Sequence, residues 1–144
     1  MKSIVLVFLI SCICLLSGCS ISPKEIDYGN DACHYCQMTI VDKIHGAEVV
    51  TNKGKVYKFD AAECMIHFIK DFDTDKIGLY LSNTYTDPTV LTDANTATFI
   101  VSESIPSPMG EYITAFKNKE DAQIVLNLKG GEMYTWQEII EKIK

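Results

Sequence analysis

Apolar positions recur along most of the chain in patterns that predict short strands and helices, but the first 18 residues differ. There, residues 4–16 form an almost unbroken apolar run behind the positive charge of Lys2. A charged start and a short apolar run are typical of a secretory signal peptide, which is too short to remain as a membrane-spanning helix. We therefore expect residues 1–18 to be removed, which leaves a mature chain of 126 residues beginning at Cys19.

Residues 32–95 have the pattern of a small strand-rich unit with one helix. Apolar and β-branched residues predict four short strands, at 39–41, 47–51, 56–59 and 77–82. Asp60 and Glu63 predict a capping box, with Asp60 as the N-cap of a helix that ends near Phe72.

Residues 96–144 repeat this order of elements. Strands are predicted at 98–102, 112–116 and 132–134. Asn118 is expected to cap a helix that ends before Gly130, and Thr135 to cap a closing helix. The repetition predicts an α+β fold of two small, similar strand-strand-helix-strand (ββαβ) units, residues 32–95 and 96–144.

The residues at the end of the signal peptide, Leu16-Ser17-Gly18-Cys19, resemble the lipobox of bacterial lipoproteins. That resemblance implies cleavage before Cys19 and acylation of Cys19, and several acyl chains anchor a protein durably at about 0.8 kcal/mol per buried CH₂. We therefore expect a lipid anchor on the extracytoplasmic side of a membrane in the cell envelope, with residues 19–31 as a polar tether. The alternative is an ordinary signal peptide with an unmodified Cys19.

Composition narrows the function. The mature chain keeps 12 lysines and 19 acidic residues, a net charge of −7, and no arginine. Phosphates require a basic patch and base edges are most often contacted by arginine, so nucleic-acid binding is disfavoured. An acidic surface is also repelled by anionic lipid, which leaves membrane attachment to the acyl chains. The chain has no phosphate-binding loop, H-E-x-x-H motif or serine beside a recognisable base, so we do not expect an enzyme.

The stretch CHYCQM, residues 33–38, places two thiols, an imidazole and a thioether within six residues. Thiolate and thioether sulfurs are soft donors that favour Cu(I) over hard metal ions. If the motif continues into the predicted strand, Cys36 and Met38 point to the same side, because side chains alternate along a strand. His34 is a weaker candidate. The motif therefore favours a Cu(I) site that uses Cys36 and Met38.

Other interpretations of the cysteines stay open. Outside the cytoplasm thiols tend to oxidise, so Cys33 and Cys36 form either a structural disulfide or a redox-active dithiol as alternatives. The redox-active pair is disfavoured because strand-like residues, rather than a helix, follow the motif. Zinc is disfavoured because no second C-x-x-C pair occurs. Cys64 shares a helix face with Ala61 and Phe68, and we expect it in the core rather than in a metal site.

An ordered series of short motifs resembles the NosL family, the nitrous oxide reductase accessory lipoproteins. The motifs are CHYCQM at 33–38, KVYKFD at 55–60, ECM at 63–65, TDA at 92–94, PMG at 108–110, AF at 115–116 and DA at 121–122. The resemblance covers nearly the whole mature chain. It implies a membrane-anchored copper chaperone of two related ββαβ units that binds Cu(I). Its implied role is maturation of the copper-sulfide site of nitrous oxide reductase, together with a membrane ABC-type complex.

The resemblance also implies the site residues. The family's Cys-x-Met and Met-Gly elements fall on residues 36–38 and 109–110, and Gln37 stands where many relatives have glycine. Cys33 is either a further ligand or the partner in a disulfide that protects the site without copper. The expected Cu(I) ligands are therefore Cys33, Cys36, Met38 and Met109.

Overall fold

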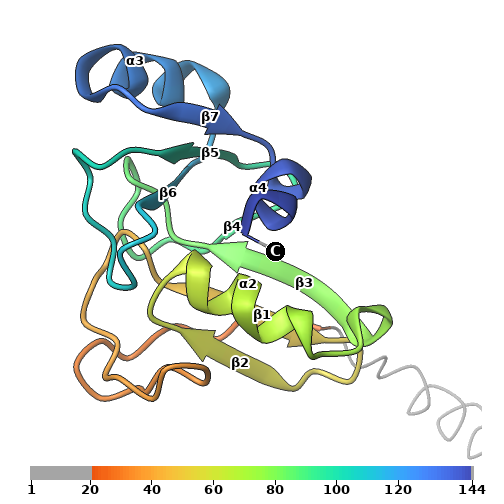
Figure 1. Ribbon diagram of the computed structural model, residues 1–144. Coiled ribbons are helices and arrows are strands. Elements are labelled where there is room, and N and C mark those ends of the chain that lie inside the picture. The colour runs from red at the N-terminus through yellow and green to blue at the C-terminus, as the bar shows by residue number, and fades with distance from the viewer. Residues whose placement is uncertain (1–20, 144) are drawn as a thin grey trace, which may run out of the picture.

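The computed structural model describes residues 21–143. The predicted signal peptide and Cys19, with its predicted acylation, lie outside the described residues. Two small antiparallel sheets and three α-helices make up the described part of the chain (Figure 1). No helix within it is both long and apolar enough to cross a membrane.

The first sheet and its helix come from the first half of the chain. The elements are β1 (Ala47–Thr51), β2 (Val56–Phe59), α2 (Ala62–Lys70), the 3-10 helix η2 (Thr74–Lys76), β3 (Ile77–Ser82) and β4 (Thr92–Asp93). The strand order is β2-β1-β3-β4, and every neighbouring pair is antiparallel. The central strand β1 is buried throughout, and α2 lies across one face of the sheet (Figure 1).

The second unit has the same topology. Its elements are β5 (Thr98–Val101), β6 (Ile113–Phe116), α3 (Lys119–Lys129), β7 (Glu132–Tyr134) and α4 (Trp136–Ile143). The strand order is β6-β5-β7, which matches β2-β1-β3 because the first strand is central in both sheets. In each unit the helix connects the second strand to the third. The α+β prediction of two similar ββαβ units is therefore confirmed.

One hydrophobic core joins the two units. Phe59 and Met65 from the first unit and Phe99 from the second belong to a single cluster of buried side chains. The Trp136 ring lies 5.5 Å from the Phe99 ring and 5.7 Å from the Tyr80 ring, so it bridges the two sheets. This shared burial holds the two units against each other.

Both helix starts predicted in the second unit are confirmed. The Asn118 side chain accepts a hydrogen bond from the backbone N–H of Asp121 at 2.9 Å. Thr135 and Glu138 form a reciprocal box, in which the Thr135 N–H donates to Glu138 at 2.7 Å and the Glu138 N–H donates to Thr135 at 3.4 Å. These bonds satisfy backbone donors that a helix leaves unpaired at its start.

The capping box predicted for α2 is wrong. The N-cap is Ala61, which makes no side-chain capping bond. The Glu63 carboxylate instead accepts hydrogen bonds from Ser107 and from the Ile113 N–H, the latter at 3.2 Å. Glu63 therefore links the first unit to the second rather than closing its own helix.

The strand predicted at 39–41 is also wrong. Only Thr39 pairs in a sheet-like manner, through an isolated bridge to Ala32. Ile40 is buried, so the apolar pattern that suggested a strand reflects burial instead. The motif at residues 33–38 consequently lies in a closed loop, and the strand-alternation argument for Cys36 and Met38 does not apply.

The predicted tether lies partly along the domain. Ile26 is buried, the Lys24 N–H donates to Glu48 at 3.0 Å, and the Asn83 side chain donates to the Tyr28 hydroxyl. Two apolar side chains in an otherwise polar segment thus hold residues 21–31 against the first sheet.

Glu48 gives a test of this packing through pH. It has no exposed surface, and burial raises the pKa of its carboxyl from 4.5 to about 7. One oxygen accepts the Lys24 N–H and the other has no partner. Because the folded-state pKa lies above the unfolded value, the charged form destabilises the fold progressively as the pH rises between those values. The full cost, about 3 kcal/mol, is present above the folded-state pKa.

Replacing Glu48 by Gln removes this charge and keeps the accepting oxygen. We expect Glu48→Gln to raise the free energy of unfolding by up to about 3 kcal/mol near pH 8, and to leave it unchanged near pH 4, where both states are protonated. Urea unfolding at the two pH values measures this. Glu103→Gln, at an exposed position, is the matched control. An equal effect at both pH values would contradict the assignment.

Candidate metal site

Residues 32–39 form a closed loop that contains the CHYCQM motif. The Cys33 N–H donates to the Met38 carbonyl at 2.8 Å, and the Gln37 N–H donates to the Cys33 carbonyl at 3.0 Å. The His34 N–H donates to the Lys58 carbonyl at 2.8 Å, which fastens the loop to β2. The loop is therefore a tight turn that is closed by hydrogen bonds within it and attached to β2 by one further bond.

Gln37 explains how the loop turns. Its φ is 64°, in the left-handed region that glycine adopts without steric cost and other residues adopt rarely. The Gln37 side-chain amide donates to the His34 carbonyl at 2.8 Å, which supports the turn locally. The loop thus keeps a conformation suited to glycine while carrying a larger residue.

Three reduced sulfurs meet beneath this loop. Cys64, from the first turn of α2, joins Cys33 and Cys36, and the three sulfur atoms all lie within 4.8 Å of one another. Cys33 and Cys64 are buried and Cys36 is half-buried. Cys64 is buried as predicted, but sequence reasoning missed its place in this group. A signal was available, because three cysteines in residues 21–143 leave at least one without a disulfide partner.

The spacing of the sulfurs suits a single ion. Metal–sulfur bonds of about 2.3 Å place three sulfurs around one ion about 4.0 Å apart. The observed upper limit of 4.8 Å is larger than this by less than about 1 Å. The three cysteines can therefore hold one ion with a small inward movement of their side chains.

The thiols differ in acidity because of their hydrogen bonds. The Cys33 sulfur accepts a bond from the Cys64 thiol and from the N–H groups of Asp60, Cys36 and Tyr35, which lowers the pKa of Cys33 to about 5 despite burial. Donation to Cys33, together with burial, raises the pKa of the Cys64 thiol. Burial raises the pKa of Cys36. These hydrogen bonds therefore favour a thiolate at Cys33 and a protonated thiol at Cys64.

His34 lies outside this group. Its ring packs edge-on against Tyr57 at 4.6 Å and Phe68 at 5.4 Å between centroids. Within residues 21–143, the only group of three or more Cys, His, Asp or Glu side chains spaced to hold a metal is the three cysteines. His34 thus contributes to the aromatic wall beside α2.

The two predicted methionine ligands lie at the surface. Met38 is 64% exposed and Met109 is 37% exposed, whereas Cys33 and Cys64 have no exposed surface. The structure therefore brings the three thiols together and leaves both thioether side chains open to solvent.

The loop that carries Met109 is fixed beside the start of α2. Ser107 hydrogen-bonds to the Glu63 carboxylate, next in sequence to Cys64. Glu111 lies 2.6 Å from His67 on α2, and the His67 ring stacks on Tyr35 at 5.4 Å between centroids. These contacts connect the loop to α2 and, through His67, to the cysteine loop.

Comparisons with known proteins agree with this fold. The family model described as NosL matches residues 23–143. A crystal structure of the copper chaperone NosL from Shewanella denitrificans matches with a TM-score of 0.72 and 25% sequence identity, over 83% of this chain and 96% of that chain. No curated protein sequence matches the chain significantly. The solved protein is a copper chaperone and not an enzyme, in agreement with the expectation from the sequence.

The unequal acidity of the three thiols gives a second prediction. We expect one thiol per molecule to titrate near pH 5 in the metal-free protein, since Cys33 is stabilised as a thiolate mainly by the Cys64 thiol. In Cys64→Ala that donor is gone, so the pKa of Cys33 should rise toward its ordinary value. The ultraviolet absorbance of the thiolate, followed against pH, measures both. An unchanged midpoint in Cys64→Ala would show that the donor is not Cys64.

Proposed function

Because the chain belongs to the NosL family, we propose that it binds Cu(I) at the cluster Cys33, Cys36 and Cys64 and delivers it for maturation of an extracytoplasmic copper enzyme. NosL proteins are copper chaperones, so the chain is not an enzyme. The observation that carries the proposal is the group of three reduced sulfurs within 4.8 Å of one another.

The donor set favours Cu(I) over zinc. Thiolates are soft ligands that suit both Cu(I) and zinc, so the number of ligands separates the two ions. The protons that thiols release on binding make the affinity depend on pH. Structural zinc requires four ligands, usually cysteine or histidine. In the described chain no further Cys, His, Asp or Glu joins the three cysteines. Three sulfurs with a thiolate already formed therefore suit Cu(I) better.

Met38 and Met109 are proposed as the outer ligands of the same ion. Both are exposed, and Met109 stands on the loop fastened to the start of α2. Neutral thioethers bind less strongly than thiolates, so the outer ligands are the ones that a partner can displace first. Cys36, the half-buried thiol, then forms the mouth of the site between the methionines and the buried pair.

The family resemblance supports a delivery target and a location. The target is nitrous oxide reductase, or the membrane ABC-type complex that matures it. The location is the extracytoplasmic side of a membrane, with acyl chains at Cys19 as the anchor.

A thiol-disulfide oxidoreductase is the competing function, and the geometry disfavours it. The thiolate that would attack a disulfide is at Cys33, which has no exposed surface. Cys36 reaches the surface, but burial raises its pKa and lowers its thiolate fraction.

Cu(I) affinity in single variants tests the proposed site. We expect Cys33→Ser, Cys36→Ser and Cys64→Ser each to weaken Cu(I) binding by more than about 100-fold, because outer-shell groups alone contribute up to about that factor. Met38→Leu and Met109→Leu should weaken it less, by roughly 10-fold. Competition with a Cu(I) chelator on the reduced protein, with thiols counted before and after, gives the affinities.

Met133→Leu is the matched control, because Met133 is a partly buried methionine in β7 that packs in the smaller core. It should bind Cu(I) like the unaltered protein. Unchanged affinity in Cys64→Ser would remove Cys64 from the site. Failure of the unaltered protein to compete with the chelator would end the proposal.

The anchor is tested separately. We expect membrane-bound protein to carry acyl chains on an N-terminal Cys19, and Cys19→Ser to remain as precursor or to appear in the soluble extracytoplasmic fraction. Intact-mass measurement of the purified protein decides this. A mature N-terminus elsewhere, without added acyl mass, would refute the lipid anchor and leave the copper site untouched.

A further inference from the structure

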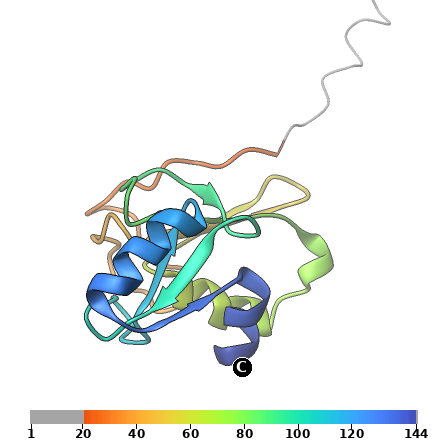
Figure 2. The same ribbon diagram turned by 90° about the horizontal axis from the view of Figure 1, so that it is seen from above.

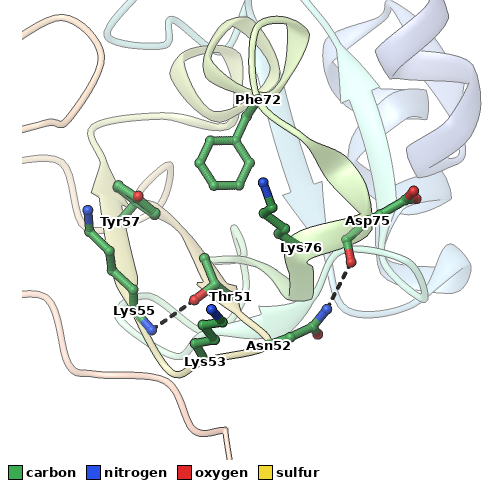
Figure 3. A pocket seen from close by; sticks show the side chains of 8 residues that line it. All are labelled: Thr51, Asn52, Lys53, Lys55, Tyr57, Phe72, Asp75 and Lys76. Atoms are coloured by element: carbon green, nitrogen blue, oxygen red, sulfur yellow. Dashed lines mark hydrogen bonds between the residues drawn. The ribbon is translucent and has the colours of Figure 1, made fainter.

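A hollow with aromatic walls and a basic rim lies beside the β1–β2 turn. Its volume is about 410 Å³, and Tyr57 and Phe72 supply its apolar surface (Figure 3). Lys53, Lys55 and Lys76 also line it, together with one acidic residue, Asp75, and Lys76 extends toward the aromatic side chains (Figure 3). We call the three lysines, Tyr57 and Phe72 the basic hairpin surface.

The local charge of this surface is opposite to that of the chain. Residues 51–58 contain three lysines and no acidic residue, in a chain of net charge −6. The Lys55 ammonium lies 4.6 Å from the centre of the Tyr57 ring. Lys76 pairs with Asp73 at 3.0 Å, but both side chains are exposed, so this pair is weak and leaves Lys76 able to contact another anion.

A second hollow extends the basic region. It shares Lys55 and Tyr57 with the first, adds Lys24 and Lys58, and reaches residues 32 and 34 of the cysteine loop. Lys58 is engaged with Asp31 at 2.6 Å, whereas Lys24 is exposed at the start of the described chain. The basic region therefore continues from the hairpin to the N-terminal segment.

The described chain begins next to this surface. The Ile21 side chain and the Asn52 side chain both lie over Gly78 in β3, where a Cβ would meet them. Asn52 is itself a lining residue of the hollow. Cys19 stands two positions before Ile21 in the sequence, and two residues span at most about 7 Å. Acyl chains at Cys19 would therefore enter a membrane close to the basic hairpin surface.

The cysteine cluster lies at the other end of the first unit. Cys64 is in the first turn of α2, Phe72 lies two residues beyond its end, and the helix is about 13 Å long. In both views the loop with the cysteines and the start of the described chain lie at opposite ends (Figures 1 and 2). A membrane at the β1–β2 turn would therefore lie beyond the end of α2 that is opposite to the cluster.

We propose that the basic hairpin surface contacts anionic phospholipid headgroups and so orients the anchored protein with its cysteine cluster directed away from the bilayer. The proposal rests on the lipid anchor of the proposed function. Lysines near an anionic leaflet are attracted to it, and tyrosine suits the headgroup region because its ring is apolar and its hydroxyl polar. The net negative charge of the chain predicts repulsion from anionic lipid. It does not show that lysines gather at this end of the molecule.

Lysine labelling of the membrane-bound protein tests the orientation. The acylated protein is reconstituted into vesicles of phosphatidylcholine, with or without phosphatidylglycerol, and each lysine's rate of reaction with an amine reagent is read by mass spectrometry. We expect Lys53, Lys55 and Lys76 to react at least about five-fold more slowly with phosphatidylglycerol present. Lys119 and Lys129, on α3 of the second unit, should react equally in both.

Two triple variants, one at the basic hairpin surface and one control, are compared next. In both, the reaction rate of Lys24 is measured. In Lys53→Gln/Lys55→Gln/Lys76→Gln the protection of Lys24 by phosphatidylglycerol should be lost. In Lys117→Gln/Lys119→Gln/Lys129→Gln, which alters exposed lysines of the second unit, it should persist. Both variants should bind Cu(I) like the unaltered protein, which shows that the fold is intact.

The outcomes separate this proposal from the anchor. If the lysines of the acylated protein react equally in both vesicle types, the proposal is wrong and the lipid anchor is unaffected. The same holds if soluble glycerol phosphate without vesicles protects the lysines equally. If no acyl group is found, the binding of the protein to phosphatidylglycerol vesicles is measured by flotation. Binding of the protein to these vesicles that is about 100-fold weaker in Lys53→Gln/Lys55→Gln/Lys76→Gln, roughly five-fold per lysine, would support the proposed contact. Absence of any partition would overturn it.

Discussion

The buried Cys33 sulfur organises the first unit, because a sulfur that has a lowered pKa and no exposed surface must be compensated by hydrogen bonds. The Cys64 thiol and three backbone N–H groups supply that compensation, and they come from the loop, from the end of β2 and from α2. Each donor fixes one structural feature. The loop must close on itself, the backbone at Asp60 must turn its N–H toward the sulfur, and α2 must begin with Cys64 in its first turn. The site is therefore part of the core, which explains how two of the three thiols stay reduced within reach of a metal and away from solvent.

The second unit shows what the same topology does without this requirement. In both units the helix N-cap stands two residues after the end of the second strand, at Ala61 after Phe59 and at Asn118 after Phe116. Asn118 caps its helix with a side-chain bond, whereas Ala61 makes none. The junction that is an ordinary capped helix start in one unit is occupied by the sulfur site in the other. Residues at functional sites are where local rules of this kind are most often broken.

The same contrast explains which features could be predicted. The limits of the predicted strands in both sheets, and the caps at Asn118 and Thr135, follow from short patterns and were correct to within one residue. The strand at 39–41 and the cap at Asp60 were wrong, β4 was not predicted, and the proximity of Cys64 to the other two thiols was missed. Each depends on contacts between residues far apart in the chain, such as Cys33 with Cys64 and the His34 N–H with the Lys58 carbonyl. A periodicity read over a few residues contains no information about such contacts.

From the innermost to the outermost sulfur of the proposed site, exposure to solvent increases and negative charge decreases. This gradient sets the order in which a partner would replace the ligands. The innermost sulfurs, Cys33 and Cys64, have no exposed surface, Cys36 is half-buried, and Met109 and Met38 are 37% and 64% exposed. The anionic sulfur is innermost and the neutral thioethers are outermost. In the proposed site, an incoming partner would therefore meet the weakest donors first and could replace them while the cysteines still hold the ion. If the basic hairpin surface lies on the membrane, this mouth opens on the opposite side, where a partner can approach it without contact with the bilayer.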